Sequence, residues 1–265
     1  MGKGAGLFNT GNGLLIGLSV ALWLLVLPGA WYAYRHLPEF GRFPSLPASS
    51  GDTSKSLTAE QKGWALATSA ILTERNEQRH DLLGGAEATA AEVAHWKGTL
   101  QEWWGVRNRK DLIGTLAWLE AAGHRRRFQK IGANLASEAN AGSDPEYARQ
   151  IELVRTHYAR LGKKSLLGWD HARFVSLCRW GYLVGYLSED EAWQWIMPKA
   201  RELQKTFDSW ADLGENYLIG REFWSRDETA MHGWRYRAAY QRLLSNPESP
   251  WARFPWTLDL GGTAG

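Results

Sequence analysis

The stretch GWDHARFVSLCRWGYLVGYLSEDEAWQW, residues 168–195, decides the fold of this chain. It predicts two helices, and the second begins at Ser188 because Glu191 follows it at the spacing of a capping box. Residues two apart on a helix point well away from each other, so Trp193 and Trp195 are expected to contact different neighbours. Helices with large aromatic side chains on several faces are surrounded on several sides, which indicates a compact multi-helix bundle.

Helix signals continue on both sides of this stretch. Thr58 and Gln61 form a second capping box, and Gly123 is a natural end for the helix before it. Asp144 followed by Pro145 is typical of a helix start. No convincing run of alternating β-branched residues appears, so we expect an all-α domain.

Tryptophan is abundant, with 16 copies in 265 residues. Each indole buries a large area and needs an acceptor for its N–H, which favours a tight core. The Pro-rich C-terminal segment NPESPWARFPWTLDLGG (residues 246–262) is called the strap, and its Trp251 and Trp256 are expected to fill gaps between helices. Pro198 should kink or divide its helix. The single cysteine, Cys178, permits no internal disulfide and is expected to be a buried, inert thiol.

The N-terminal region is expected to hold a membrane anchor. Residues 13–34, GLLIGLSVALWLLVLPGAWYAY, contain no charged side chain and have the length of a membrane-spanning helix. Aromatic residues at one end suit an aromatic belt, and the segment is too long for an ordinary signal peptide. The expected organisation is an N-terminal tail (1–12), a transmembrane anchor (13–34), a linker (35–56) and a helical domain (57–265).

The orientation of the anchor follows from the basic residues beside it. Lys3 precedes the span, whereas Arg35, Arg42 and Lys55 follow it. The positive-inside rule therefore favours a single-pass protein that is bound to the lipid bilayer through residues 13–34 and has its C-terminal domain in the cytoplasm.

Signatures of common catalytic sites are missing from the sequence. It contains no Gly-rich phosphate loop after a strand, no HExxH motif and no cysteine cluster for zinc. No GxSxG nucleophile motif occurs either. We therefore expect no cofactor and no metal ion.

Polar residues on the predicted central helices form the candidate catalytic site. Asp170 and Arg173 stand three apart at a helix start, where they either pair and favour the helix dipole or, together with His171, provide acid–base groups in a cleft. Glu215 and Arg221 lie in an otherwise apolar helix and must find partners. These residues either line a pocket or form one buried structural network with Arg179.

The segment from Arg107 to Lys130 is strongly basic. It is either a solvated helix face or a surface for anionic lipid headgroups. Nucleic acid is the lesser alternative, because no known nucleic-acid-binding motif accompanies the charge. The candidate binding residues are Arg107, Arg125, Arg126, Arg127 and Lys130, with Arg109 and Lys110 in the same segment.

Several Trp-rich blocks in series resemble the bacterial domain-of-unknown-function 1266 family (DUF1266). They are GWALATSAIL, WWGVRNRKDLIGTLAWLEAAGHRRRF, the stretch quoted above, SWADLGENYLIGREFW and the closing PWARFPW, spread over residues 63–260. The resemblance implies a bacterial, mainly helical domain and supplies no reaction or catalytic residue. With the predicted anchor, it places the protein in the bacterial inner membrane.

These observations favour a membrane-anchored binding, scaffold or regulatory module with an unidentified protein partner. The alternative is a metal-independent hydrolase in which Asp170 or Glu215 is the acid–base group and an arginine holds an anionic substrate. A weaker alternative is binding of anionic lipid or nucleic acid through residues 107–130.

Overall fold

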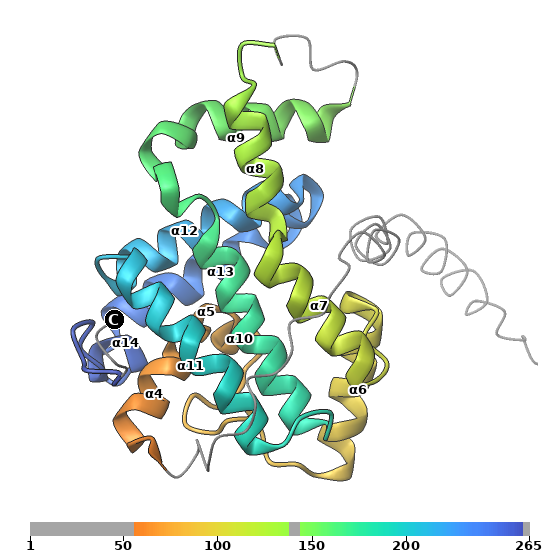
Figure 1. Cartoon of the computed structure of the whole chain (residues 1–265), viewed down its shortest axis with the longest axis vertical. Coiled ribbons are helices and arrows are strands. Elements are labelled where there is room, and N and C mark those ends of the chain that lie inside the picture. The colour runs from red at the N-terminus through yellow and green to blue at the C-terminus, as the bar shows by residue number, and fades with distance from the viewer. Residues whose placement is uncertain (1–55, 138–143, 262–265) are drawn as a thin grey trace, which may run out of the picture. The chain divides into compact units, whose positions relative to one another are not determined.

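A computed structural model describes residues 56–137 and 144–261, and these ranges form helices joined by short connections (Figure 1). No strand occurs in them, so the all-α prediction is confirmed for this part of the chain. The expected tail and anchor, and all of the expected linker except its last residue, lie outside the described residues. The elements are α4 (Ala59–Ala67), α5 (Ala70–Arg75), α6 (Ala90–Trp104), α7 (Arg109–Ala121), α8 (Gly123–Ala133), α9 (Pro145–Leu161), the 3₁₀ helix η3 (Gly162–Lys164), α10 (Leu167–Leu183), α11 (Glu189–Thr206), α12 (Trp210–Trp224), α13 (Arg226–Ser245) and α14 (Pro250–Arg253).

Helix α10 lies at the centre of the described helices (Figure 1). It packs against α7, α11 and α12 and also contacts α5, α6 and α8. All of its residues except Leu167 and Tyr182 are buried, including charged ones. A helix covered on every side needs no polar face, which explains the aromatic and apolar residues spread around it.

The predicted helix starts are found where the capping residues place them. Thr58 and Ser188 each accept a backbone N–H and form complete capping boxes with Gln61 and Glu191. Helix α9 begins at Pro145 behind the Asp144 cap. Because each of these interactions is local in sequence, the amino-acid pattern is sufficient to predict it.

Pro198 does not divide its helix. Helix α11 continues through it to Thr206, with buried apolar residues on both sides, among them Trp195 and Leu203. Packing of both halves against the core therefore holds the segment as one helix, although proline removes a backbone hydrogen bond.

Four indoles join the C-terminal strap to the core. Trp64 and Trp210 have ring centroids 4.7 Å apart, and Trp256 lies 4.8 Å and Trp251 5.9 Å from Trp210. Every indole N–H in this group donates to a backbone carbonyl oxygen. The prediction that Trp251 and Trp256 fill gaps between helices is confirmed.

The two tryptophans of α11 do contact different neighbours. Trp195 stacks on Phe174 with ring centroids 5.6 Å apart, whereas Trp193 lies under the Lys62 ammonium and donates to the Glu189 carboxylate. Cys178 is fully buried in α10, as expected for an inert thiol.

Helices α8 and α9 lie side by side at one end of the bundle (Figure 1). Phe128 of α8 contacts Phe223 of α12 edge to face, with ring centroids 5.4 Å apart. The short η3 then leads the chain back into α10. Within the described ranges, no helix has both the length and the apolar character needed to cross a bilayer.

Candidate functional site

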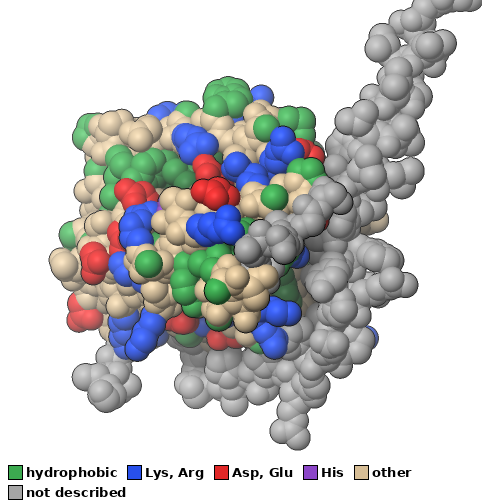
Figure 2. Space-filling view, turned by 90° about the horizontal axis from the view of Figure 1, so that it is seen from above, with side chains coloured by type: hydrophobic (Ala, Val, Ile, Leu, Met, Phe, Trp, Pro, Cys, Tyr) green, Lys and Arg blue, Asp and Glu red, His purple; other side chains and the backbone are tan. Residues whose placement is uncertain are grey.

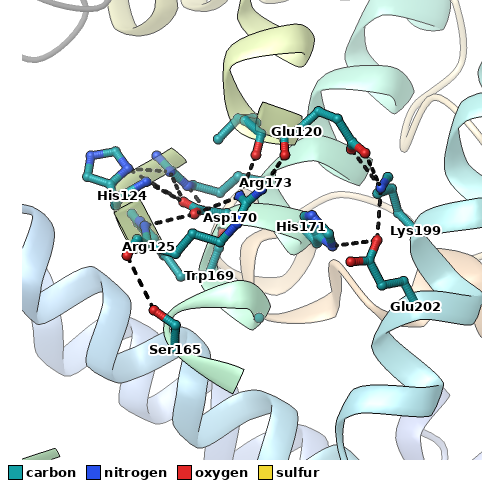
Figure 3. Close-up of polar contacts among 12 residues, drawn as sticks. Glu120, His124, Arg125, Ser165, Trp169, Asp170, His171, Arg173, Lys199 and Glu202 are labelled. Atoms are coloured by element: carbon teal, nitrogen blue, oxygen red, sulfur yellow. Dashed lines mark hydrogen bonds and ion pairs between the residues drawn. The ribbon is translucent and has the colours of Figure 1, made fainter. Parts of the chain in front are cut away.

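Asp170 caps the first turn of α8 from another helix (Figure 3). Helix α8 begins after Ala122, whose side chain has no acceptor, so its first N–H groups lack a local partner. The Asp170 carboxylate accepts hydrogen bonds from the backbone N–H groups of His124 and Arg125, each 3.0 Å long. Asp170 thus takes the role that Ser, Asn or Asp takes at an ordinary N-cap.

Two guanidinium groups also face this carboxylate. Arg125 Nη1 and Arg173 Nη2 each lie 3.2 Å from one of the oxygens of Asp170, whose side chain is 0% exposed. Burial opposes ionisation, but the charges of Arg173 and Arg125, together with the hydrogen bonds from the backbone N–H groups of His124 and Arg125, outweigh it and hold the Asp170 pKa well below its usual range. Asp170 is therefore a buried carboxylate at neutral pH.

His124 completes this cluster as a neutral ring. Arg173 Nη2 donates to His124 Nδ1 over 2.8 Å, which requires that nitrogen to be unprotonated. Burial and then the Arg173 charge lower the His124 pKa in agreement with this geometry. The Arg173 guanidinium also lies 4.0 Å from the Trp169 ring centroid, a cation–π contact.

This arrangement supports the structural interpretation of Asp170 and Arg173. A general acid or base must reach the proton that it transfers. The Asp170 carboxylate is buried, accepts four hydrogen bonds and stays ionised. In this geometry its carboxylate holds α8 on α10 instead of facing a substrate.

The structure does not bring the other two candidate catalytic residues to Asp170. Glu215 is exposed on α12 and its carboxylate pairs with Arg160 at 3.2 Å. Arg221 is buried, donates to the Glu228 backbone oxygen over 3.0 Å and lies 3.9 Å from the Tyr236 ring centroid. The expectation that these residues form one buried network is therefore wrong, because Glu215 lies at the surface beside Arg160 whereas Arg221 is buried beside Glu228.

Arg179 forms a third, separate centre. It is buried without a carboxylate partner among the described residues, and its five hydrogen bonds go to neutral oxygens. Burial lowers its pKa to about 10, so it stays charged at neutral pH. Its acceptors are Ser69, Thr73 and the carbonyls of Arg79, Leu82 and Leu83. Arg179 therefore holds the connection between α5 and α6 on the core.

A further polar cluster lies on the other side of Asp170 (Figure 3). Lys199 Nζ bridges Glu120 and Glu202 at 2.8 and 2.9 Å. His171 lies beside this group, with its Nδ1 3.7 Å from the Glu202 carboxylate but with no hydrogen bond to either ring nitrogen from the described residues. Burial, then the charges of Lys199 and Arg125, lower its pKa to about 3. The spacing of Lys199 and Glu202 could have revealed their pairing, whereas Glu120 comes from a distant helix. The described ranges hold no group of His, Cys, Asp and Glu suited to a metal ion.

The basic segment does not form one solvated face. Arg109 is half-buried and forks onto Glu191, with nitrogen–oxygen distances of 2.9 and 2.7 Å, and Arg125 turns inward to Asp170. The segment's exposed cations are Arg107, Lys110, Arg126, Arg127 and Lys130. Figure 2, seen from above Figure 1, shows acidic side chains and apolar patches interspersed with Lys and Arg.

A solvent-open cleft of about 700 Å³ lies where α8 and α9 meet the core. Its walls come from α8, from the end of α9 and from η3, with the end of α7 beside them. Of the predicted binding residues, Arg125 and Arg126 line it. The lining residues are Ala121, Ala122, Arg125, Arg126, Gln129, Tyr158, Ala159, Gly162, Lys163 and Ser165.

The sequence alone did not reveal this cleft. Lys163 stands in the short turn after α9 and carried no functional signal. The one signal available was a basic residue directly after a helix-ending glycine, Gly162, which marks an exposed turn. The rest of the lining depends on the packing of α8 against α9, which sequence spacing does not reveal.

Comparisons with known proteins agree with the resemblance seen in the sequence. The chain is 24% identical to uncharacterized protein YbeU of Escherichia coli (strain K12) over 58% of its length and 73% of that protein. It is also 24% identical to uncharacterized protein YbeR of the same organism, over 47% of this chain and 56% of YbeR. No solved structure matches. The model of a protein family of unknown function matches residues 99–256, more than half of the chain, so the chain belongs to DUF1266.

Proposed function

We propose that this protein is a membrane-tethered binding module that recognises a partner at the cleft between α8, α9 and η3. The observation that carries the proposal is the cleft itself, because it is open to solvent and lined by mixed polar, basic and apolar side chains. Recognition sites are commonly concave, with a few polar groups that fix the orientation of the ligand.

The cleft is favoured over the Asp170 cluster because of solvent access. The groups around Asp170 are buried and use their hydrogen-bonding capacity on one another. The cleft instead exposes Arg126, Ala159 and Lys163. A scaffold or regulatory role needs only such a surface and no reacting group.

The tether is proposed from the uncharged segment 13–34 and the linker 35–56. They would hold the helical domain at the cytoplasmic face of the bacterial inner membrane. Fractionation tests this part: the full-length protein should stay in the membrane pellet after alkaline carbonate washing. Its release into the supernatant would argue against an integral anchor.

Site-specific photo-crosslinking in living cells tests the recognition surface. Ala159 is exposed and lines the cleft, so a photoreactive amino acid there should give a discrete adduct. Ala94 is the matched control, because it is an exposed alanine on α6 outside the cleft. Equal adducts from both positions, or none from Ala159, would count against the cleft as the binding site.

A further inference from the structure

We infer that the cleft takes an acidic segment of a partner polypeptide. The inference rests on the proposed role of the cleft and specifies the chemistry of its ligand. The lining contains three cationic side chains, those of Arg125, Arg126 and Lys163, and no carboxylate. A recess lined by one sign of charge attracts groups of the opposite sign.

The three cations differ in how far the protein itself neutralises them. Arg125 is committed to Asp170 at 3.2 Å. Arg126 and Lys163 are exposed, and among the described residues neither has a carboxylate at ion-pair distance. Two cations of the lining, one on α8 and one on η3, therefore remain available to an incoming ligand.

Basic residues next to the cleft, in contrast, are paired with carboxylates. Lys164, next to Lys163, lies 3.0 Å from the Asp208 carboxylate and also contacts Asp212. Arg160, at the end of α9, is paired with Glu215. These three carboxylates are thus engaged outside the cleft, whereas Arg126 and Lys163 inside it have no ion-pair partner among the described residues.

The rest of the lining suits a polypeptide. Ala121, Ala122 and Ala159 offer small apolar contacts beside the ring of Tyr158. Small-molecule sites usually enclose about 70–90% of their ligand, whereas this cleft is broadly open to solvent. A segment that lays one face into the cleft, with an apolar residue between acidic ones, fits both its shape and its charge.

Peptide display on the detergent-solubilised full-length protein tests the inference. A random 12-residue library is selected for binding, without bias in charge. Enriched peptides should be acidic. The double substitution Arg126→Glu and Lys163→Glu should weaken their binding roughly tenfold or more, because both attractive contacts become repulsive. The matched control, Arg107→Glu with Lys110→Glu, changes two exposed cations outside the cleft and should alter affinity less than about twofold.

The outcomes separate this inference from the proposed function. Neutral or basic peptides that crosslink to a probe at Ala159 would overturn the acidic ligand and leave the cleft as the binding site. If the enriched peptides neither crosslink to a probe at Ala159 nor bind more weakly to the Arg126→Glu, Lys163→Glu variant, the acidic ligand and the cleft as binding site would both be overturned. Binding of inorganic phosphate or anionic vesicles, with no acidic peptide enriched, would also overturn the inference.

Discussion

Asp170 on α10 occupies the space that a Cβ atom on Gly123 would need. A Cβ built at position 123 would collide with both carboxylate oxygens, and the glycine backbone has φ +54°. Close approach lets Asp170 reach the first turn of α8, where it also meets Arg125. Because Arg125 lines the cleft, the same contact that joins two helices also shapes the proposed recognition surface.

Substitution of Gly123 by alanine should be strongly destabilising. Gly123→Ala adds a steric clash to the cost of a left-handed residue, and together these should lower the free energy of unfolding by about 2–5 kcal/mol. Gly185→Ala is the matched control, since Gly185 has φ +78° with open space around it, so only about 1–2 kcal/mol should be lost. Equal losses in urea unfolding would show that the Asp170 contact is unimportant.

Neutralisation of Asp170 should destabilise the fold without changing its shape. Asp170→Asn leaves the guanidinium groups of Arg125 and Arg173 without their buried counter-charge, which should cost about 3–5 kcal/mol. Glu215→Gln removes a half-exposed ion pair with Arg160 and should cost at most about 1 kcal/mol. If Asp170→Asn kept full stability, the carboxylate would be free for another role.

Stability should fall with acid. His171 has a folded pKa of about 3, below the unfolded value of about 6.5, so protons bind the unfolded state more tightly. Its contribution is complete above about pH 6.5 and is lost as the pH falls toward 3, at up to about 1.4 kcal/mol per pH unit. The depressed Asp170 pKa adds a further loss below about pH 4. Urea unfolding should show that the free energy of unfolding falls less between pH 7 and pH 5 in His171→Asn than in the wild type. Equal falls in the two proteins would contradict this assignment.

Cys178 should act as an internal reporter of unfolding. Burial raises the pKa of its thiol, and the side chain is fully covered. A maleimide reagent should label the native full-length protein very slowly and label it rapidly in urea. Mass spectrometry measures the labelled fraction, and rapid labelling without denaturant would mean that α10 is not packed as described.

Local signals made most of the helical fold predictable. Thr58, Asn108 and Ser188 each cap a helix through an atom three residues away, so the sequence alone contains the interaction. The continuity of α11 through Pro198 was not predictable in this way. It depends on apolar packing from other helices, which outweighs a local preference.

The candidate site was only half predictable, for the same reason. Asp170 and Arg173 are close in sequence, and their pairing follows from helical spacing. The partner that explains Asp170 is the start of α8, which is 45 residues away. Glu215 was expected among buried groups because its helix is apolar, yet its position on the helix turns it toward Arg160 at the surface.

Lysine footprinting of the wild-type protein reports directly whether a partner occupies the cleft. An amine-reactive reagent is applied to native membranes and to the salt-washed, purified protein, and both Lys163 and Lys110 are quantified by mass spectrometry. Both lysines are exposed, but only Lys163 lines the cleft. Lys163 should be protected in the membranes and become reactive on purification, while Lys110 should react equally in both samples. Equal reactivity of Lys163 in the two samples would contradict binding of a partner in the cleft.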